Sequence, residues 1–153
     1  MVRFEPMEKD EFPSYWKYVV ESYTSDMQRA GLIKEDITYK EAEDRVRSFL
    51  PDGMGTSGHH FMHVVSEDER VGAVWYEIRD KVVIEAYLWD VVINEKHRGS
   101  GYGRQTMEEL EAAARKEGAV RISLNVFGSN TVARTLYTGM GYQDAAITMM
   151  KYL

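Results

Sequence analysis

Apolar residues recur with a helical period in the first third of the chain. Between about residues 10 and 31, apolar and aromatic positions fall three or four residues apart: Phe12, Tyr15, Trp16, Val19, Val20 and Tyr23. A second helix fits residues 38–50, because Thr38 followed by Glu41 can form a capping box and Pro51 stops the helix. The pattern therefore predicts two consecutive helices, followed by the flexible loop "DGMGTSG".

The middle of the chain shows patterns typical of β-strands. "HFMHVV" and "RVGAVWYEI" are separated by "SEDE", which predicts a hairpin, and "RDK" predicts a tight turn into a strand at Val82–Ile93. This strand is apolar on both faces, so we expect it at the centre of a sheet that is covered on both sides. "VRFEPM" at the start, the alternating "VRISLNVF" and a last hairpin strand, "ITMMKYL", complete the predicted strands.

Two further helices separate the later strands. One follows a glycine-rich turn and ends at Gly118, and the other covers Asn130–Met140. The predicted order is β, αα, βββ, α, β, α, β, which indicates an α/β fold with a mixed sheet flanked by helices. Because no repeat, low-complexity segment or linker interrupts this order, residues 1–153 are expected to form one domain.

The turn between the long strand and the third helix is a candidate anion site. In "HRGSGYGRQT", Gly99, Gly101 and Gly103 lie between Arg98 and Arg104. Glycines let the backbone approach a ligand closely, and a helix start offers free N–H groups to a phosphate or pyrophosphate. No Gly-Lys-Ser/Thr follows, so the turn is not a P-loop, and its position near residue 100 makes it a poor dinucleotide fingerprint.

Two motifs resemble those of the GNAT N-acetyltransferase superfamily. "RGSGYG" resembles the family's Arg/Gln-x-x-Gly-x-Gly/Ala acetyl-CoA motif, and "NVFGSNTVARTLYTGMGY" resembles its N-x-x-A-x-x-L-Y-x-x-x-G-F/Y segment. The predicted strand order is also that of the family. The resemblance covers essentially the whole chain, most clearly from about residue 70 onward. It implies a mostly antiparallel sheet with a splayed central strand pair, and acetyl-CoA as the co-substrate.

The resemblance also implies which residues hold acetyl-CoA. Backbone groups of Val91 and Ile93 would contact the pantetheine arm, and the Val91 amide would stabilise the oxyanion. Asn130 would contact acetyl-CoA by its side chain, and Arg134 could reach its 3′-phosphate or adenine region. The pyrophosphate would lie on the turn formed by Arg98, Gly99, Ser100, Gly101, Tyr102, Gly103 and Arg104.

The expected chemistry is direct acetyl transfer to a primary amine in a ternary complex. Tyr137 matches the family tyrosine near the sulfur and is the candidate acid. The base is less clear: Glu85 and Asp90 are the carboxylates of the central strand, but a regular strand would aim them at opposite faces unless a bulge intervenes. Glu85 is our first hypothesis for the group that holds the ammonium or accepts its proton. Asn125 stands where relatives that acetylate peptide N-termini often carry glutamate.

Charge and composition limit the partners. Residues 1–94 carry 19 acidic and 11 basic side chains, a net of −8, which suits a cationic small amine, polyamine or lysine-bearing peptide. A pI near 5.3 argues against nucleic acid, and no apolar stretch predicts a membrane span. Without cysteine there is no disulfide or thiolate zinc site. We expect a cytoplasmic protein, with a homodimer left open.

Two alternatives remain from the residues alone. His59, His60 and His63 could suggest a metal site, but no carboxylate pair is spaced to complete it, so we expect none. A non-catalytic domain that binds acyl-CoA, as a sensor or assembly module, is the alternative to an enzyme. The aromatic residues Tyr15, Trp16, Tyr23, Trp75, Tyr87 and Trp89 could line an acceptor cleft, although most are expected in the core.

Overall fold

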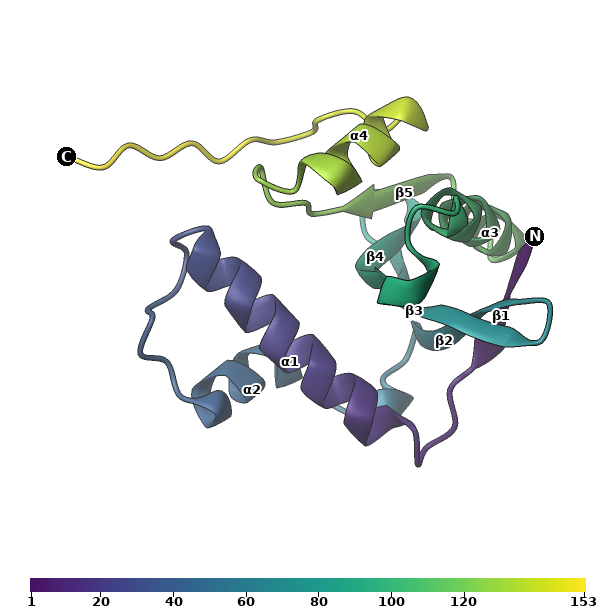
Figure 1. Cartoon of the computed structure of the whole chain (residues 1–153), viewed down its shortest axis with the longest axis horizontal. Helices are drawn as coiled ribbons and strands as arrows, with labels where there is room; N and C mark the ends of the chain where they lie inside the picture. Colours follow the sequence, from purple (N-terminus) through teal and green to yellow (C-terminus); the bar gives the residue numbers. More distant parts are fainter.

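One sheet organises the computed structural model, which describes residues 1–153 (Figure 1). Its strands lie in the order β1-β2-β3-β4-β5. The first four pair antiparallel with their neighbours, and β4 and β5 pair parallel. This confirms the predicted mixed, mostly antiparallel sheet. The bounds of the strands are β1 Val2–Pro6, β2 His59–Ser66, β3 Glu69–Asp80, β4 Ile84–Ile93 and β5 Arg121–Leu124.

Helices cover both faces of the sheet (Figure 1). On one face, helices α1 and α2 pack around Phe61, Ala73 and Trp75. On the other face, α3 and α4 pack around a second cluster that includes Val74 and Leu88. None of the helices combines the length and the apolar character that crossing a membrane requires. The helix bounds are α1 Phe12–Arg29, α2 Tyr39–Arg47, α3 Tyr102–Lys116 and α4 Thr131–Gly139.

The start of α2 has the predicted capping box. The Thr38 hydroxyl accepts a hydrogen bond from the Glu41 backbone N–H at 3.2 Å, and the Glu41 carboxylate accepts one from the Thr38 N–H at 2.8 Å. These bonds satisfy two of the N–H groups that a helix start leaves free. The α-helix ends at Arg47, three residues before the predicted limit, and the chain then turns so that Leu50 is buried in the core.

Buried residues alternate between the two faces along β3. Val74 faces the α3 side and Trp75 the α1 side, and both are almost fully buried. A strand that is covered on both faces needs apolar side chains at consecutive positions, which explains its continuous apolar pattern.

The pair β4 and β5 separates partway along its length. The parallel pairing joins Glu85–Leu88 to Arg121–Leu124 and stops there, while β4 continues beside β3 as far as Ile93. Residues 89–93 of β4 therefore have a strand neighbour on one side only. This confirms the predicted splay of the central strands.

A bulge interrupts β4 just where the splay begins. Trp75 pairs with Asp90 but the next residue, Tyr76, pairs with Leu88, so Trp89 is an extra residue in β4. Its indole stacks on Trp75, with ring centroids 5.2 Å apart, and Asp90 bonds to Tyr15 of α1. Two consecutive side chains of β4 thus face α1, which brings Asp90 to the same face as Glu85.

The predicted last strand is absent, and the predicted fifth strand is shorter than expected. Residues 142–153, including "ITMMKYL", form no strand and leave α4 as an extended segment (Figure 1). A strand needs a paired neighbour, and no backbone hydrogen bond joins residues 143–153 to the sheet. Of "VRISLNVF", only Arg121–Leu124 are in a strand, because β4 diverges beyond Leu88.

Candidate active site

Two of the three glycines in the turn before α3 adopt a left-handed backbone. Gly99 has φ of 77° and Gly101 has φ of 83°, a conformation that side-chain-bearing residues rarely adopt. A Cβ atom at Gly99 would meet no atom within 4 Å, and one at Gly101 would lie 4.0 Å from the Gln105 amide nitrogen. The turn is therefore open on its outer side, where a ligand could approach the backbone.

The start of α3 has the properties of an anion site. Its N-cap is Gly101, which supplies no capping side chain, and its first turn contains no acidic residue. The first N–H groups of this 15-residue helix are thus left without side-chain acceptors, at the positive end of the helix dipole. The turn is thus open to an anion, and its assignment to the pyrophosphate of acetyl-CoA stays a prediction.

The third glycine is needed for a different reason. Gly103 lies within α3, and a Cβ there would come within 3.4 Å of the Leu136 side chain of α4. Arg104 extends toward the end of α4, 3.6 Å from where a Cβ on Gly139 would lie, and the Tyr102 ring packs edge-on against His97. Gly103 and Arg104 therefore lie against α4, while Gly99, Ser100 and Gly101 stay exposed.

Three of the predicted acetyl-CoA contacts are engaged within the chain. The Arg98 Nε donates to the Ile93 carbonyl at 3.0 Å, so this carbonyl already has a donor. The Asn130 side-chain oxygen caps α4 by accepting from the Ala133 N–H at 3.1 Å. Arg134 donates to the Gly128 carbonyl at 3.4 Å. Each is an exposed side chain, so these contacts can exchange for contacts with a ligand.

Asp90 lies at the mouth of the splay with an unusual environment. The Tyr15 hydroxyl donates to its carboxylate at 2.7 Å. Burial raises the pKa of Asp90 to about 6, against the opposing effect of hydrogen bonds from Tyr15 and the Val91 N–H and with a smaller contribution from the charge of Asp26. A carboxyl group with this pKa is mostly ionised at neutral pH and can still take up a proton.

The charge of Asp90 affects the pKa of Tyr137. Tyr137 lies on α4 and is buried, with 8% of its surface exposed. Burial, with a smaller contribution from the negative charge of Asp90, raises the pKa of Tyr137 to about 12. Its hydroxyl therefore keeps its proton at neutral pH, as a proton donor must. Val91 packs in the same apolar cluster as Tyr137, and Asp90 is the residue before Val91 on β4.

Sequence reasoning missed two further residues around Asp90. Burial and the charge of Asp90 raise the pKa of Tyr18 to about 12, and Arg98 opposes this shift. Asp26, also on α1, has a pKa raised by burial, and its negative charge in turn raises the pKa of Asp90. The available signal was the spacing of Tyr15 and Tyr18, which share one face of α1.

Glu85 has a structural environment. Its carboxylate is 2% exposed and accepts hydrogen bonds from Arg79 at 2.9 Å, Arg121 at 2.7 Å and Ser123 at 2.6 Å. Burial alone would raise the pKa of Glu85, but these three donors outweigh it and lower the pKa to about 2. Both oxygens are engaged in joining β3, β4 and β5, which argues against Glu85 as the proton acceptor.

The three histidines have three separate sets of contacts. His59 accepts a hydrogen bond from the Trp75 indole at 2.9 Å, and His60 stacks on Tyr76. His63 lies 2.9 Å from the Glu11 carboxylate.

Of the aromatic candidates for the acceptor cleft, Tyr15, Trp16 and Trp75 are buried, and Tyr23, Tyr87 and Trp89 are partly exposed.

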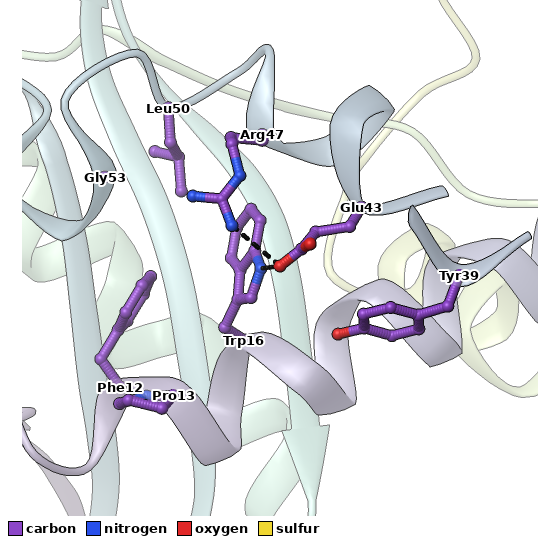
Figure 2. Close-up of a pocket in the computed structure, with 8 residues that line it drawn as sticks. All are labelled: Phe12, Pro13, Trp16, Tyr39, Glu43, Arg47, Leu50 and Gly53. Carbon is purple, nitrogen blue, oxygen red and sulfur yellow. Dashed lines mark hydrogen bonds and ion pairs between the residues drawn. The ribbon is translucent and has the colours of Figure 1, made fainter. Parts of the chain in front are cut away.

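A cavity of about 380 Å³ lies between α1 and α2. Figure 2 shows Phe12, Pro13 and Trp16 on one wall, with the Glu43 carboxylate beside the Trp16 indole and the Arg47 guanidinium and joined to each by a dashed line. Glu43 accepts from Trp16 at 3.0 Å and from Arg47 at 2.8 Å, so its charge is already paired. The cavity is not lined by the glycine turn or by the residues around Asp90, and it is separate from the candidate reaction centre.

Comparison with known proteins identifies the family. Residues 16–142 match the model of the Acetyltransferase (GNAT) family. The chain is 31% identical over 154 residues to the uncharacterized N-acetyltransferase YycN of Bacillus subtilis strain 168, with 99% of each chain covered. It is 28% identical over 99 residues to the [ribosomal protein bS18]-alanine N-acetyltransferase of Salmonella typhimurium, with 64% of this chain and 66% of that protein covered.

Solved structures give the same result. The crystal structure of the putative acetyltransferase YycN from Bacillus subtilis superposes with a TM-score of 0.94 over 100% of this chain and 99% of its own. A predicted acetyltransferase from Clostridium acetobutylicum, 15% identical and solved with acetyl-CoA, has the same fold with a TM-score of 0.65 over 99% of this chain and 96% of its own. The chain therefore belongs to the GNAT family of acetyl-CoA-dependent N-acetyltransferases.

Proposed function

We propose that this chain transfers the acetyl group of acetyl-CoA to a cationic primary amine, with Asp90 as the proton acceptor and Tyr137 as the proton donor. The observation that carries the proposal is the set of groups found where β4 loses β5 as a neighbour. Asp90 and Val91 are consecutive on β4, Val91 packs in the same apolar cluster as Tyr137 of α4, and the charge of Asp90 contributes to the raised pKa of Tyr137, which supports this arrangement.

Asp90 can remove the proton that keeps the amine from reacting. An alkylamine is mostly protonated at neutral pH and must lose a proton before it can attack a carbonyl carbon. Asp90 is mostly ionised above its pKa of about 6 and can take that proton, directly or through water. The Tyr15 hydroxyl, 2.7 Å from the carboxylate, holds Asp90 in position.

The Val91 N–H and the Tyr137 hydroxyl act on the thioester, whose carbon–sulfur bond breaks. When bound, acetyl-CoA supplies an activated acyl group as a thioester. In this proposal the Val91 N–H exchanges its hydrogen bond to Asp90 for one to the acyl oxygen that gains negative charge. Tyr137 is suited to protonate the departing sulfur, since its hydroxyl remains protonated at neutral pH. No cysteine is present to carry the acyl group, so attack is direct.

The charge around Asp90 favours a cationic acceptor. The charge of Asp26 raises the pKa of Asp90, the charge of Asp90 raises that of Tyr18, and Tyr15 donates a hydrogen bond to Asp90, so a second carboxylate and two tyrosines interact with the proposed proton acceptor. The overall charge of residues 1–94, net −8, acts in the same direction. A small amine, a polyamine and a lysine-bearing peptide all have this chemistry.

The experiment that tests the proposal combines a substrate screen with two carboxylate variants. Amines, polyamines and peptides are incubated with acetyl-CoA, and coenzyme A release is followed by a thiol reagent, which is free of background because the chain has no cysteine. With the best acceptor, Asp90→Asn should lower kcat by about 10²-fold or more. Glu85→Gln should lower stability, while the folded fraction retains its activity.

The outcomes separate the possibilities. Loss of turnover in folded Glu85→Gln with normal turnover in Asp90→Asn would restore Glu85 as the acceptor of the proton. Tight acetyl-CoA binding in calorimetry, without thiol release for any acceptor in the screen, would favour a sensor or assembly module.

A further inference from the structure

Four partly exposed aromatic side chains form a cluster on the face of the sheet that Asp90 shares. The ring of Phe49, in the turn after α2, has its centroid 4.6 Å from that of Trp89. Tyr87 meets Trp89 edge-on at 4.7 Å, and Tyr23 of α1 meets Phe49 edge-on at 6.5 Å. None of the four is fully buried, so the aromatic cluster presents apolar surface to solvent beside the candidate reaction centre.

The aromatic cluster adjoins the proposed proton acceptor. The bulge turns the consecutive residues Trp89 and Asp90 to one face, and Tyr87 lies on β4 three residues before Asp90, roughly 10 Å away along an extended strand. β4 has no β5 partner beyond Leu88, so this part of the strand is open on one side. A molecule whose amine lies at Asp90 therefore has the aromatic rings within reach of a short chain of atoms.

The rings of the aromatic cluster are held in place by contacts within the protein. Trp89 stacks on the buried Trp75, with ring centroids 5.2 Å apart and an interplanar angle of 16°, and its indole N–H donates to Glu77 at 3.1 Å. Rings that are already ordered lose little conformational freedom when a ligand packs against them. The cluster is therefore suited to bind a planar or bulky apolar group, for which aromatic side chains are the usual lining.

The charged groups beside the aromatic cluster already have partners. The Arg79 guanidinium lies 4.1 Å from the Tyr87 ring centroid, and its Nε donates to Glu85 at 2.9 Å. Glu77 accepts from the Trp89 indole and lies 3.8 Å from Arg79. Neither Glu77 nor Glu85 is thus free to bind the second ammonium group of a diamine or polyamine.

We propose that the acceptor is an arylalkylamine, a primary amine joined by a short alkyl chain to an aromatic ring, and that Phe49, Tyr87 and Trp89 select it by packing against that ring. This inference rests on the proposed function, because it places the reacting nitrogen at Asp90. It narrows the acceptor class that charge alone leaves open. The ring of an arylalkylamine is buried against apolar surface, whereas the second cation of a diamine would lose water there without a free carboxylate to bind it.

The first experiment compares three amines on the wild-type chain. Coenzyme A release is measured with 3-phenylpropylamine, n-butylamine and putrescine at saturating acetyl-CoA. All three present a primary amine on an unbranched alkyl chain, so they differ in what the far end of the chain offers. We expect kcat/KM for 3-phenylpropylamine to exceed that for each of the other two at least tenfold, mainly through a lower KM. Equal values for the three amines, or the highest value for putrescine or n-butylamine, would overturn the proposal.

Substitutions in the aromatic cluster test which residues select the ring. Phe49→Ala should lower the ratio of kcat/KM for 3-phenylpropylamine to that for n-butylamine at least fivefold. Tyr39→Ala removes an aromatic ring that is 47% exposed on α2, outside the cluster, and should leave this ratio as in the wild type. If Phe49→Ala does not fold, Trp89→Leu, which keeps an apolar residue in the bulge, takes its place. A ratio that is unchanged in the cluster variant, or lowered equally by Tyr39→Ala, would contradict the assignment.

Binding without turnover separates this inference from the proposed function. Calorimetry measures the affinity of 3-phenylpropylamine and n-butylamine for the wild type and the cluster variant, each saturated with coenzyme A, which carries no acetyl group to transfer. Tighter binding of the aromatic amine that is lost in the cluster variant supports the aromatic subsite, and if no amine is acetylated by the same protein, the proposed function alone fails. Equal binding of the two amines overturns the subsite, whether or not either is acetylated.

Discussion

Two carboxylates on β4 show how local surroundings decide what the same side-chain chemistry does. Glu85 and Asp90 face the same side of the sheet, five residues apart. Three donors hold Glu85 ionised with a pKa of about 2, whereas Asp90 has a pKa of about 6 because burial outweighs its two hydrogen bonds. The first therefore stabilises the sheet, and the second is available to exchange protons.

At the residue scale, Asp90 should set the acid limb of the pH profile. Its carboxylate must be ionised to accept a proton, so kcat/KM should rise with pH through about 6 and level off above it. Asp90→Asn should lower the rate and remove this limb. The measurement is initial rate against pH between 5 and 9, with thiol release as the readout.

Asp26→Asn provides a control with a defined sign. The negative charge of Asp26 raises the pKa of Asp90, so its removal should move the acid limb to lower pH without abolishing turnover. A limb that stays at the same pH in both variants would assign it to another group, such as the acceptor amine.

Tyr137→Phe tests the donor of the second proton. The substitution keeps the ring in its buried site and removes the hydroxyl. We expect kcat to fall by roughly 10²–10⁴, the usual contribution of a general acid, with little change in acetyl-CoA affinity. Steady-state rates and calorimetry measure the two quantities. If affinity collapses while kcat is kept, Tyr137 is a binding residue.

At the element scale, the turn before α3 combines two different uses of glycine. Gly101 has a left-handed backbone at an open helix start, and Gly103 provides space for α4. A side chain at the first position would extend into the open space where the ligand is expected, and one at the second would press on Leu136. Substitutions at these two glycines should therefore affect binding and packing separately.

Gly101→Glu should weaken acetyl-CoA binding at least tenfold, which is about 1.4 kcal/mol. The new side chain puts a negative charge at the positive end of α3, where the pyrophosphate is expected. Gly118→Glu is the matched control, because Gly118 has the same φ of 83° and open surroundings at the other end of the helix. Calorimetry on both variants separates backbone strain from ligand repulsion; equal affinities would place the cofactor elsewhere.

Elements with strong local signals could be predicted from the sequence, and those that depend on a neighbour could not. The capping box at Thr38 and the glycine turn are encoded in a few adjacent residues, and both are found. The direction of Asp90 depends on a bulge at Trp89, an apolar residue that carries no bulge signal. Strict alternation places Asp90 on the face opposite Glu85, and only the bulge brings both to one face.

The ends of the strands depend on pairing as well. β5 stops at Leu124 because β4 turns away from it, although the alternating pattern continues to Val126. The final strand was predicted from β-propensity and alternation, which say nothing about whether a partner strand is available. Tyr18 and Asp26 were missed because only the packing of α1 on β4 brings them to Asp90.

At the scale of the whole molecule, the separation of charge should influence the entry of the acceptor. Residues 1–94 have a net charge of −8 and residues 95–153 carry 6 acidic and 8 basic side chains, a net of +2. The first part contributes α1 and β4 to the acceptor side, and the second contributes the glycine turn. An anionic ligand and a cationic one are thereby drawn to different parts of the chain.

Raising the salt concentration should therefore raise the KM of a cationic amine and leave kcat less affected. Long-range attraction weakens as the screening length falls from about 10 Å at 0.1 M to about 3 Å at 1 M. Rates for a cationic and an uncharged acceptor across this range measure the effect. A preference for anionic acceptors that is insensitive to salt would mean that the acidic part has no role in substrate attraction.

The ion-pair network around Glu85 also determines what a pH experiment on this enzyme can report. Arg79, Arg121 and Ser123 join β3, β4 and β5 through Glu85, where β4 and β5 are still paired, and the Glu85 carboxylate loses its charge only near pH 2. Asp90, at the open end, changes charge near pH 6. Near pH 6 the Glu85 ion pairs are intact, so the activity profile reports the titration of Asp90 and not a loosening of the junction between β3, β4 and β5.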